Sequence, residues 1–133
     1  MTFLETTVLV RYLTRDDPMK AGRCEQLFKR AEAGREELCL THLVLAETVW
    51  VLSSHYQFSN VEIARGLKRI LNTPHLFCEE ISSLLAAVDL YESTTLSFID
   101  AYHATVLPDK GITTFYSYDT DFDRIAGITR REP

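Results

Sequence analysis

Short apolar segments alternate with longer segments of helical spacing along this chain of 133 residues, and this alternation strongly constrains the fold. We predict strands at residues 1–5, 38–40, 75–78, 113–117 and 128–130. We predict helices at residues 6–13, 18–33, 42–52, 59–71, 82–92 and 98–107, with a short helical turn at 121–125. Such alternation is typical of α/β folds with a mostly parallel sheet, in which ligands bind at the carboxyl ends of the strands.

Local signals mark the ends of several predicted helices. Asp17 followed by Pro18 is typical of a helix start, and Gly34 of a helix stop. Thr41 can cap the third helix, and Ser59 with Glu62 has the spacing of a capping box.

Length and composition indicate one soluble domain spanning residues 1–133, with 46% hydrophobic and 25% charged residues. No apolar stretch approaches the length of a membrane span, and the N-terminus lacks the features of a signal peptide. The three cysteines are widely spaced, which indicates reduced thiols and a cytoplasmic location. The four histidines lack zinc-like spacing.

A net charge of −5 argues against general electrostatic attraction to nucleic acid. The argument weakens if several acids are gathered in one site and neutralised by a metal ion. Basic residues form two clusters, for which solvated faces are the simplest interpretation: Arg65, Lys68 and Arg69, and Arg124, Arg130 and Arg131.

Four carboxylates lie within or directly after apolar segments: Glu5, Glu47, Asp100 and Asp119. A buried carboxylate must be paired, neutralised or bound to a metal, because burying it alone costs several kcal/mol. Glu5 and Asp119 follow predicted strands, whereas Glu47 and Asp100 lie on predicted helices. If all four converge, they would hold a divalent cation suited to phosphodiester hydrolysis.

Each acid also has a purely structural interpretation. Glu5 can be a helix N-terminal acid, Glu47 can pair with an arginine, and Asp100 can cap a helix. Residues 119–121 can form an acidic turn in which Asp119 or Thr120 caps the next helix. Only the joint placement of the acids favours a functional site.

The order of motifs resembles the PIN domain, and specifically the VapC-type ribonuclease toxins of toxin–antitoxin pairs. The resemblance is carried by residues 3–9, 45–52, 98–104 and 117–125, and it covers nearly the whole chain. It implies a three-layer α/β/α sandwich with a mostly parallel central sheet of about five strands.

The resemblance also implies a function. Glu5, Asp100 and Asp119 would bind Mg²⁺ or Mn²⁺ together with Glu47, and Asp121 would support the site. The chain would be a metal-dependent endoribonuclease that cleaves RNA, forms a homodimer and is bound by a cognate antitoxin protein.

Three positions depart from the family pattern. Glu5 stands where the family normally has Asp, Thr7 where it normally has Asn, and Ser97 where Asp is frequent. The extra methylene of Glu5 changes the reach of its carboxylate, and octahedral Mg²⁺ sites are strict about distance. The alternative function is therefore an attenuated or inactive module whose acidic pocket binds a basic residue of a partner.

Other enzyme classes fit the sequence less well. The haloacid-dehalogenase phosphatases need an Asp nucleophile with a second Asp two residues later, but this chain has Glu5 and Thr7. The five glycines form neither a dinucleotide-binding nor a nucleotide-phosphate loop.

Overall fold

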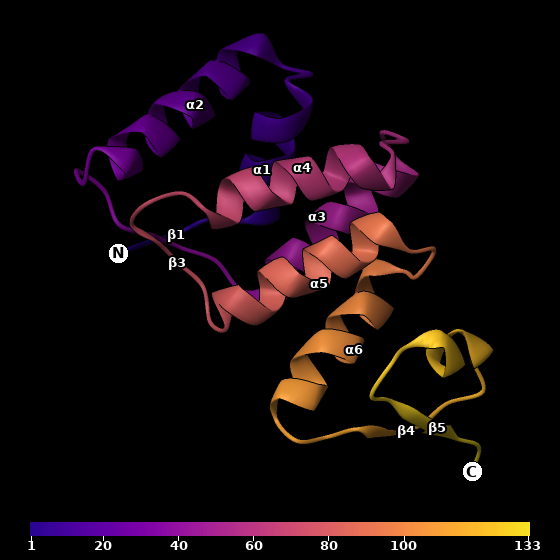
Figure 1. Ribbon diagram of the computed structural model, residues 1–133. Helices are drawn as coiled ribbons and strands as arrows, with labels where there is room; N and C mark the ends of the chain where they lie inside the picture. Colours follow the sequence, from indigo (N-terminus) through magenta and orange to yellow (C-terminus); the bar gives the residue numbers. More distant parts are fainter. The chain divides into compact units, whose positions relative to one another are not determined.

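The strands and helices alternate in the order that the sequence predicts (Figure 1). The computed structural model describes every residue from Met1 to Pro133, and the chain divides into two units, Met1–Glu79 and Glu80–Pro133. The first unit contains β1 (Thr2–Phe3), α1 (Thr6–Thr14), α2 (Pro18–Glu32), β2 (Leu38–Cys39), α3 (His42–Ser54), α4 (Asn60–Leu71) and β3 (Leu76–Phe77). The second contains α5 (Ile81–Ser93), α6 (Phe98–Asp109), β4 (Thr114–Tyr116), the 3₁₀ helix η1 (Thr120–Arg124) and β5 (Thr129–Arg131). None of the helices combines the length and apolar composition that crossing a bilayer requires.

The first unit is built on a parallel sheet with the strand order β1-β2-β3. Leu38 of β2 pairs with Leu76 of β3, and both side chains are buried. The prediction of a buried strand at residues 1–5 is wrong for Thr2 and Phe3, which are exposed, because β1 lies at the edge of this sheet. Leu4, directly after β1, enters the core.

The helices of the first unit begin at the capping residues expected from the sequence. Asp17 Oδ1 accepts from Lys20 N at 3.1 Å, and Ser59 with Glu62 forms a complete capping box. Helix α1 packs against α2 and α3, and α3 packs against α4. The buried side chains Leu9, Leu45, Leu52 and Leu67 come from three of these helices.

In the second unit, α5 packs against α6, and β4 pairs with β5 in parallel. Its smaller core is formed by Ala104, Phe115 and Phe122, and the two phenylalanine rings meet edge to face with centroids 5.4 Å apart. The α/β class with parallel strands is thus confirmed. The five strands are distributed between a three-stranded and a two-stranded sheet.

Candidate active site

Glu5 is the N-cap of α1 in the first unit. Its Oε2 accepts hydrogen bonds from Thr7 N at 2.9 Å and from Thr7 Oγ1 at 2.6 Å. The hydrogen bond from the Thr7 hydroxyl, followed by that from the Thr7 backbone, holds the pKa of Glu5 below its ordinary value. The structural interpretation as a helix N-terminal acid therefore describes its local bonding. Thr7 takes two of the roughly four acceptor positions of a carboxylate, so Glu5 retains acceptor capacity.

Glu47 lies in the middle of α3 with its side chain exposed. The helical period places its neighbours Val44, Thr48 and Val49 on the buried face, whereas Leu43 and Trp50 are exposed like Glu47 itself. Asp119 and Glu5 are exposed as well. The sequence argument that these carboxylates are buried and so need a cation is therefore wrong for Glu5, Glu47 and Asp119. Their functional interpretation depends on their position instead.

Asp100 lies in the first turn of α6 in the second unit and is half-buried. Its backbone N–H donates to the hydroxyl of Ser97, the N-cap residue, at 3.1 Å. Asp100 lines a pocket of about 360 Å³ together with His103, Thr114, Tyr116, Ser117 and the apolar Leu107, Ile112, Phe115 and Phe122.

Ser117 connects this pocket to the next predicted acid. The backbone N–H of Asp119 donates to Ser117 Oγ at 2.9 Å, and Asp119 Oδ1 accepts from Asp121 N at 2.9 Å. Ser117 lines the same pocket as Asp100, and Asp119, which caps η1, comes two residues after Ser117 in the chain. Neither unit alone gathers three metal-ligating groups of the His, Cys, Asp or Glu type. The convergence of all four acids remains a prediction.

Arg130 is a residue whose role the sequence interpretation missed. Its guanidinium donates to both oxygens of Asp123 at 3.0 and 3.2 Å, to the Ser117 carbonyl at 2.9 Å and to Glu132 at 3.1 Å. These carboxylates raise the pKa of Arg130, and only 14% of its side chain is exposed. The interpretation of this basic cluster as a solvated face is therefore wrong for Arg130, which ties β5 to the segment before Asp119. No spacing in the sequence indicates such a contact.

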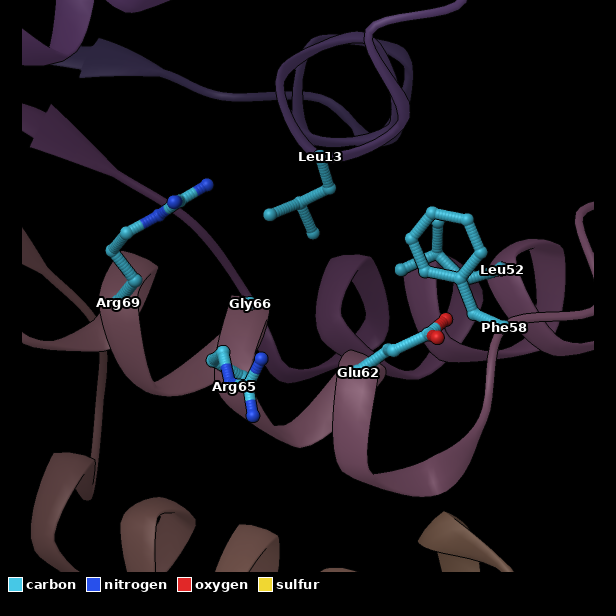
Figure 2. Close-up of a pocket in the computed structure, with 7 residues that line it drawn as sticks. All are labelled: Leu13, Leu52, Phe58, Glu62, Arg65, Gly66 and Arg69. Atoms are coloured by element: carbon cyan, nitrogen blue, oxygen red, sulfur yellow. The ribbon is translucent and has the colours of Figure 1, made fainter.

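The other basic cluster lies beside a small pocket of about 150 Å³ among α1, α3 and α4. Figure 2 shows Arg65 and Arg69 on α4, on either side of Gly66, with Leu13 of α1 facing the same helix. The Arg69 guanidinium carbon lies 5.0 Å from the centre of the Tyr12 ring, within cation–π range. Arg69 is thus partly engaged inside the first unit.

A family model described as the PIN domain matches residues 2–128. The chain belongs to the PIN domain family. The crystal structure of Mycobacterium tuberculosis VapC20, a sarcin–ricin loop cleaving toxin, is similar to this PIN domain at 20% identity. That match covers 100% of both chains with a TM-score of 0.43. A comparison with curated proteins gives no match.

PIN domains are nucleases of the hydrolase class that use divalent metal ions. The predicted ligands of this PIN domain supply only carboxylate oxygens, the donor type that Mg²⁺ and Mn²⁺ prefer. The lowered pKa of Glu5 keeps that carboxylate ionised, as metal binding requires. The donor chemistry therefore fits the family's metal ions.

Proposed function

We propose that this PIN domain is a metal-dependent endoribonuclease and the toxin of a type II toxin–antitoxin pair. The observation that carries the proposal is the family match over residues 2–128. In support, Asp100 and Ser117 line one pocket, and the Ser117 hydroxyl accepts from the backbone N–H of Asp119. Carboxylates near one pocket supply the oxygen donors that a divalent metal ion and phosphodiester hydrolysis need.

The proposed ligands of Mg²⁺ or Mn²⁺ are Glu5, Glu47, Asp100 and Asp119, with Asp121 in support. When bound, the metal would stabilise charge on the phosphoryl oxygens and lower the pKa of the attacking water. Thr7 orients Glu5 through its hydroxyl, and Ser97 fixes the turn that carries Asp100. The expected substrate is single-stranded or looped RNA, whose backbone is accessible.

The alternative is a catalytically attenuated or inactive module. It is favoured by one specific observation, the two hydrogen bonds from Thr7 that occupy Glu5 Oε2. In that case the acidic pocket would accept a basic residue of a partner, and the cognate antitoxin is the natural candidate. Homodimer formation and a cytoplasmic location are further parts of the proposal.

The test uses the full chain freed of any partner, incubated with an RNA that contains single-stranded loops. We expect cleavage with Mg²⁺ or Mn²⁺, none with EDTA, and none for Asp100→Asn. Asp109→Asn is a matched control, because Asp109 ends the same helix and accepts a hydrogen bond from Ser83 instead. Circular dichroism verifies that both variants fold. Cleavage that persists in EDTA or in Asp100→Asn would contradict the mechanism.

A further inference from the structure

A third pocket, of about 460 Å³, lies between α1 and α2 in the first unit. Thr7, Val8 and Arg11 line it from α1, at the spacing of one helical turn. Lys20, Arg23 and Cys24 line it from α2 in the same way. Three of its six lining residues are therefore cationic, and none is acidic.

The positive charge of this pocket is only partly offset. Arg11 Nη1 donates to Asp16 Oδ2 at 2.7 Å, so that part of its charge is compensated. Lys20 Nζ lies 4.0 Å from Asp17, a loose and exposed pair of the kind that contributes little. Arg23 Nη2 contacts the sulfur of Met19 at 3.8 Å, a neutral partner that leaves its charge uncompensated. The pocket thus presents net positive charge on a chain whose total is −5.

Thr7 belongs both to this pocket and to the hydrogen-bonded environment of Glu5. Thr7 therefore places the basic pocket directly beside the Glu5 carboxylate on α1. An acidic nuclease needs a local positive surface of this kind, because its overall charge repels phosphate.

We propose that the α1/α2 pocket binds the phosphodiester backbone of the RNA strand beside the cleaved bond, an inference that rests on the proposed ribonuclease function. Lys20 and Arg23 of α2 contact the phosphate, and Arg11, which is held in place by its ion pair with Asp16, lines the α1 side of the pocket. Such contacts position the strand without reading its sequence.

The first test measures binding of a labelled single-stranded oligoribonucleotide to the full chain in EDTA, as a function of salt. The double variant Lys20→Gln with Arg23→Gln removes two charges from the pocket. We expect its affinity to fall several-fold and its salt slope to fall by about 0.7 for each phosphate that is no longer neutralised. The matched control is Lys29→Gln with Arg30→Gln, which removes two charges from the last turn of the same helix. Equal changes in slope for the two double variants would overturn the proposal.

Cys24 provides a second readout that does not depend on cleavage. It lines the pocket, and peptide mass spectrometry separates its alkylation from that of Cys39 and Cys78. We expect the oligoribonucleotide to protect Cys24 from iodoacetamide in the unchanged protein and not in the Lys20→Gln, Arg23→Gln variant. Absence of protection by RNA, or protection by a polyglutamate peptide instead, would overturn the proposal.

The two proposals fail separately. RNA that protects Cys24 but is never cleaved with Mg²⁺ or Mn²⁺ would reject the ribonuclease function and retain the phosphate pocket. Cleavage without protection of Cys24, and with equal salt slopes in both double variants, would reject the pocket and retain the function.

Discussion

The Thr7 hydroxyl donates to Glu5 Oε2 across 2.6 Å, and the Thr7 backbone N–H donates to the same oxygen. Both residues stand at positions where the sequence resemblance to PIN domains leads us to expect other residue types, Asp and Asn. The two departures are therefore physically linked: the longer carboxylate of Glu5 is hydrogen-bonded to the hydroxyl of Thr7 at the start of α1.

Removing the Thr7 hydroxyl should raise the pKa of Glu5. In Thr7→Val, only the backbone donors remain, so the pKa moves back toward its ordinary value. A lowered carboxylate pKa gives stability that is present at neutral pH and lost as the pH falls through the folded-state pKa, so this acid-side dependence should weaken in Thr7→Val. An NMR titration of the Glu5 side chain measures the shift. Thr7→Ser keeps the hydroxyl, and an unchanged pKa in Thr7→Val would contradict the assignment.

Restoring the family's residues should strengthen metal binding. In Glu5→Asp with Thr7→Asn, the shorter carboxylate and the amide replace the observed pair. We expect Mn²⁺ affinity to rise on the order of tenfold, because residues that orient metal ligands typically affect affinity by about 10–100-fold. Mn²⁺ titration followed by electron paramagnetic resonance gives the affinity, and RNA cleavage is measured in parallel. Weaker Mn²⁺ binding in the double variant would show that Glu5 and Thr7 suit this chain's own site.

The sequence predicts most of the fold because its helix boundaries depend on local chemistry. Asp17, Thr41 and Ser59 cap their helices through backbone N–H groups three residues away, so their effect is visible in the sequence. The division of five strands into two sheets is not visible in this way, since pairing depends on residues distant in the chain.

The candidate site was predictable only in part, for the same reason. Ser117 lies two residues before Asp119, which is the spacing of a hydroxyl-capped turn, and this signal was available. Arg130 reaches the Ser117 carbonyl from 13 residues away, which no local pattern indicates. The apolar context of Glu47 suggested burial, but the helical period turns that side chain outward.

Substitutions at Gly66 of α4 and Leu13 of α1 should have coupled effects on the free energy of unfolding. A Cβ at position 66 would lie 2.9 Å from Leu13 Cδ2, so alanine there forces the leucine to move (Figure 2). In a Leu13→Ala background, Gly66→Ala should stabilise by roughly 0.5–1 kcal/mol through helix propensity. With Leu13 present, overpacking should cancel or reverse that gain.

These substitutions form a double-mutant cycle of four proteins: the unchanged chain, the two single variants and the double variant. Chemical denaturation of the four gives the coupling free energy, which we expect to be about 1 kcal/mol. Gly22 of α2 is the control, because a Cβ there meets no atom within 4 Å. Gly22→Ala should give the same gain whether or not Leu13 is present. Additive effects of the Gly66 and Leu13 substitutions would show that the close approach has no energetic consequence.

Arg130 should be required for order in the segment from Ser117 to Asp121. Lysine keeps the charge but cannot bond both oxygens of Asp123 and the Ser117 carbonyl together. Arg130→Lys should therefore lower the Tm and speed amide hydrogen exchange at Asp119 and Asp121 several-fold, with a matching loss of RNA cleavage. Arg131→Lys, at the exposed neighbouring position, should leave all three unchanged. Equal exchange rates in the two variants would contradict a supporting role.

Cys78 should be nearly inert to alkylation at neutral pH. Burial, followed by the adjacent charge of Glu79, raises the pKa of Cys78 to about 11. Because the thiolate is the reactive form, its rate with iodoacetamide should rise about tenfold for each pH unit between pH 8 and pH 10. Peptide mass spectrometry after timed alkylation measures this rate. Glu79→Gln should raise the rate only slightly, since burial is the larger cause, and a rate that levels off near pH 8.5 would show that the thiol is not shielded from water.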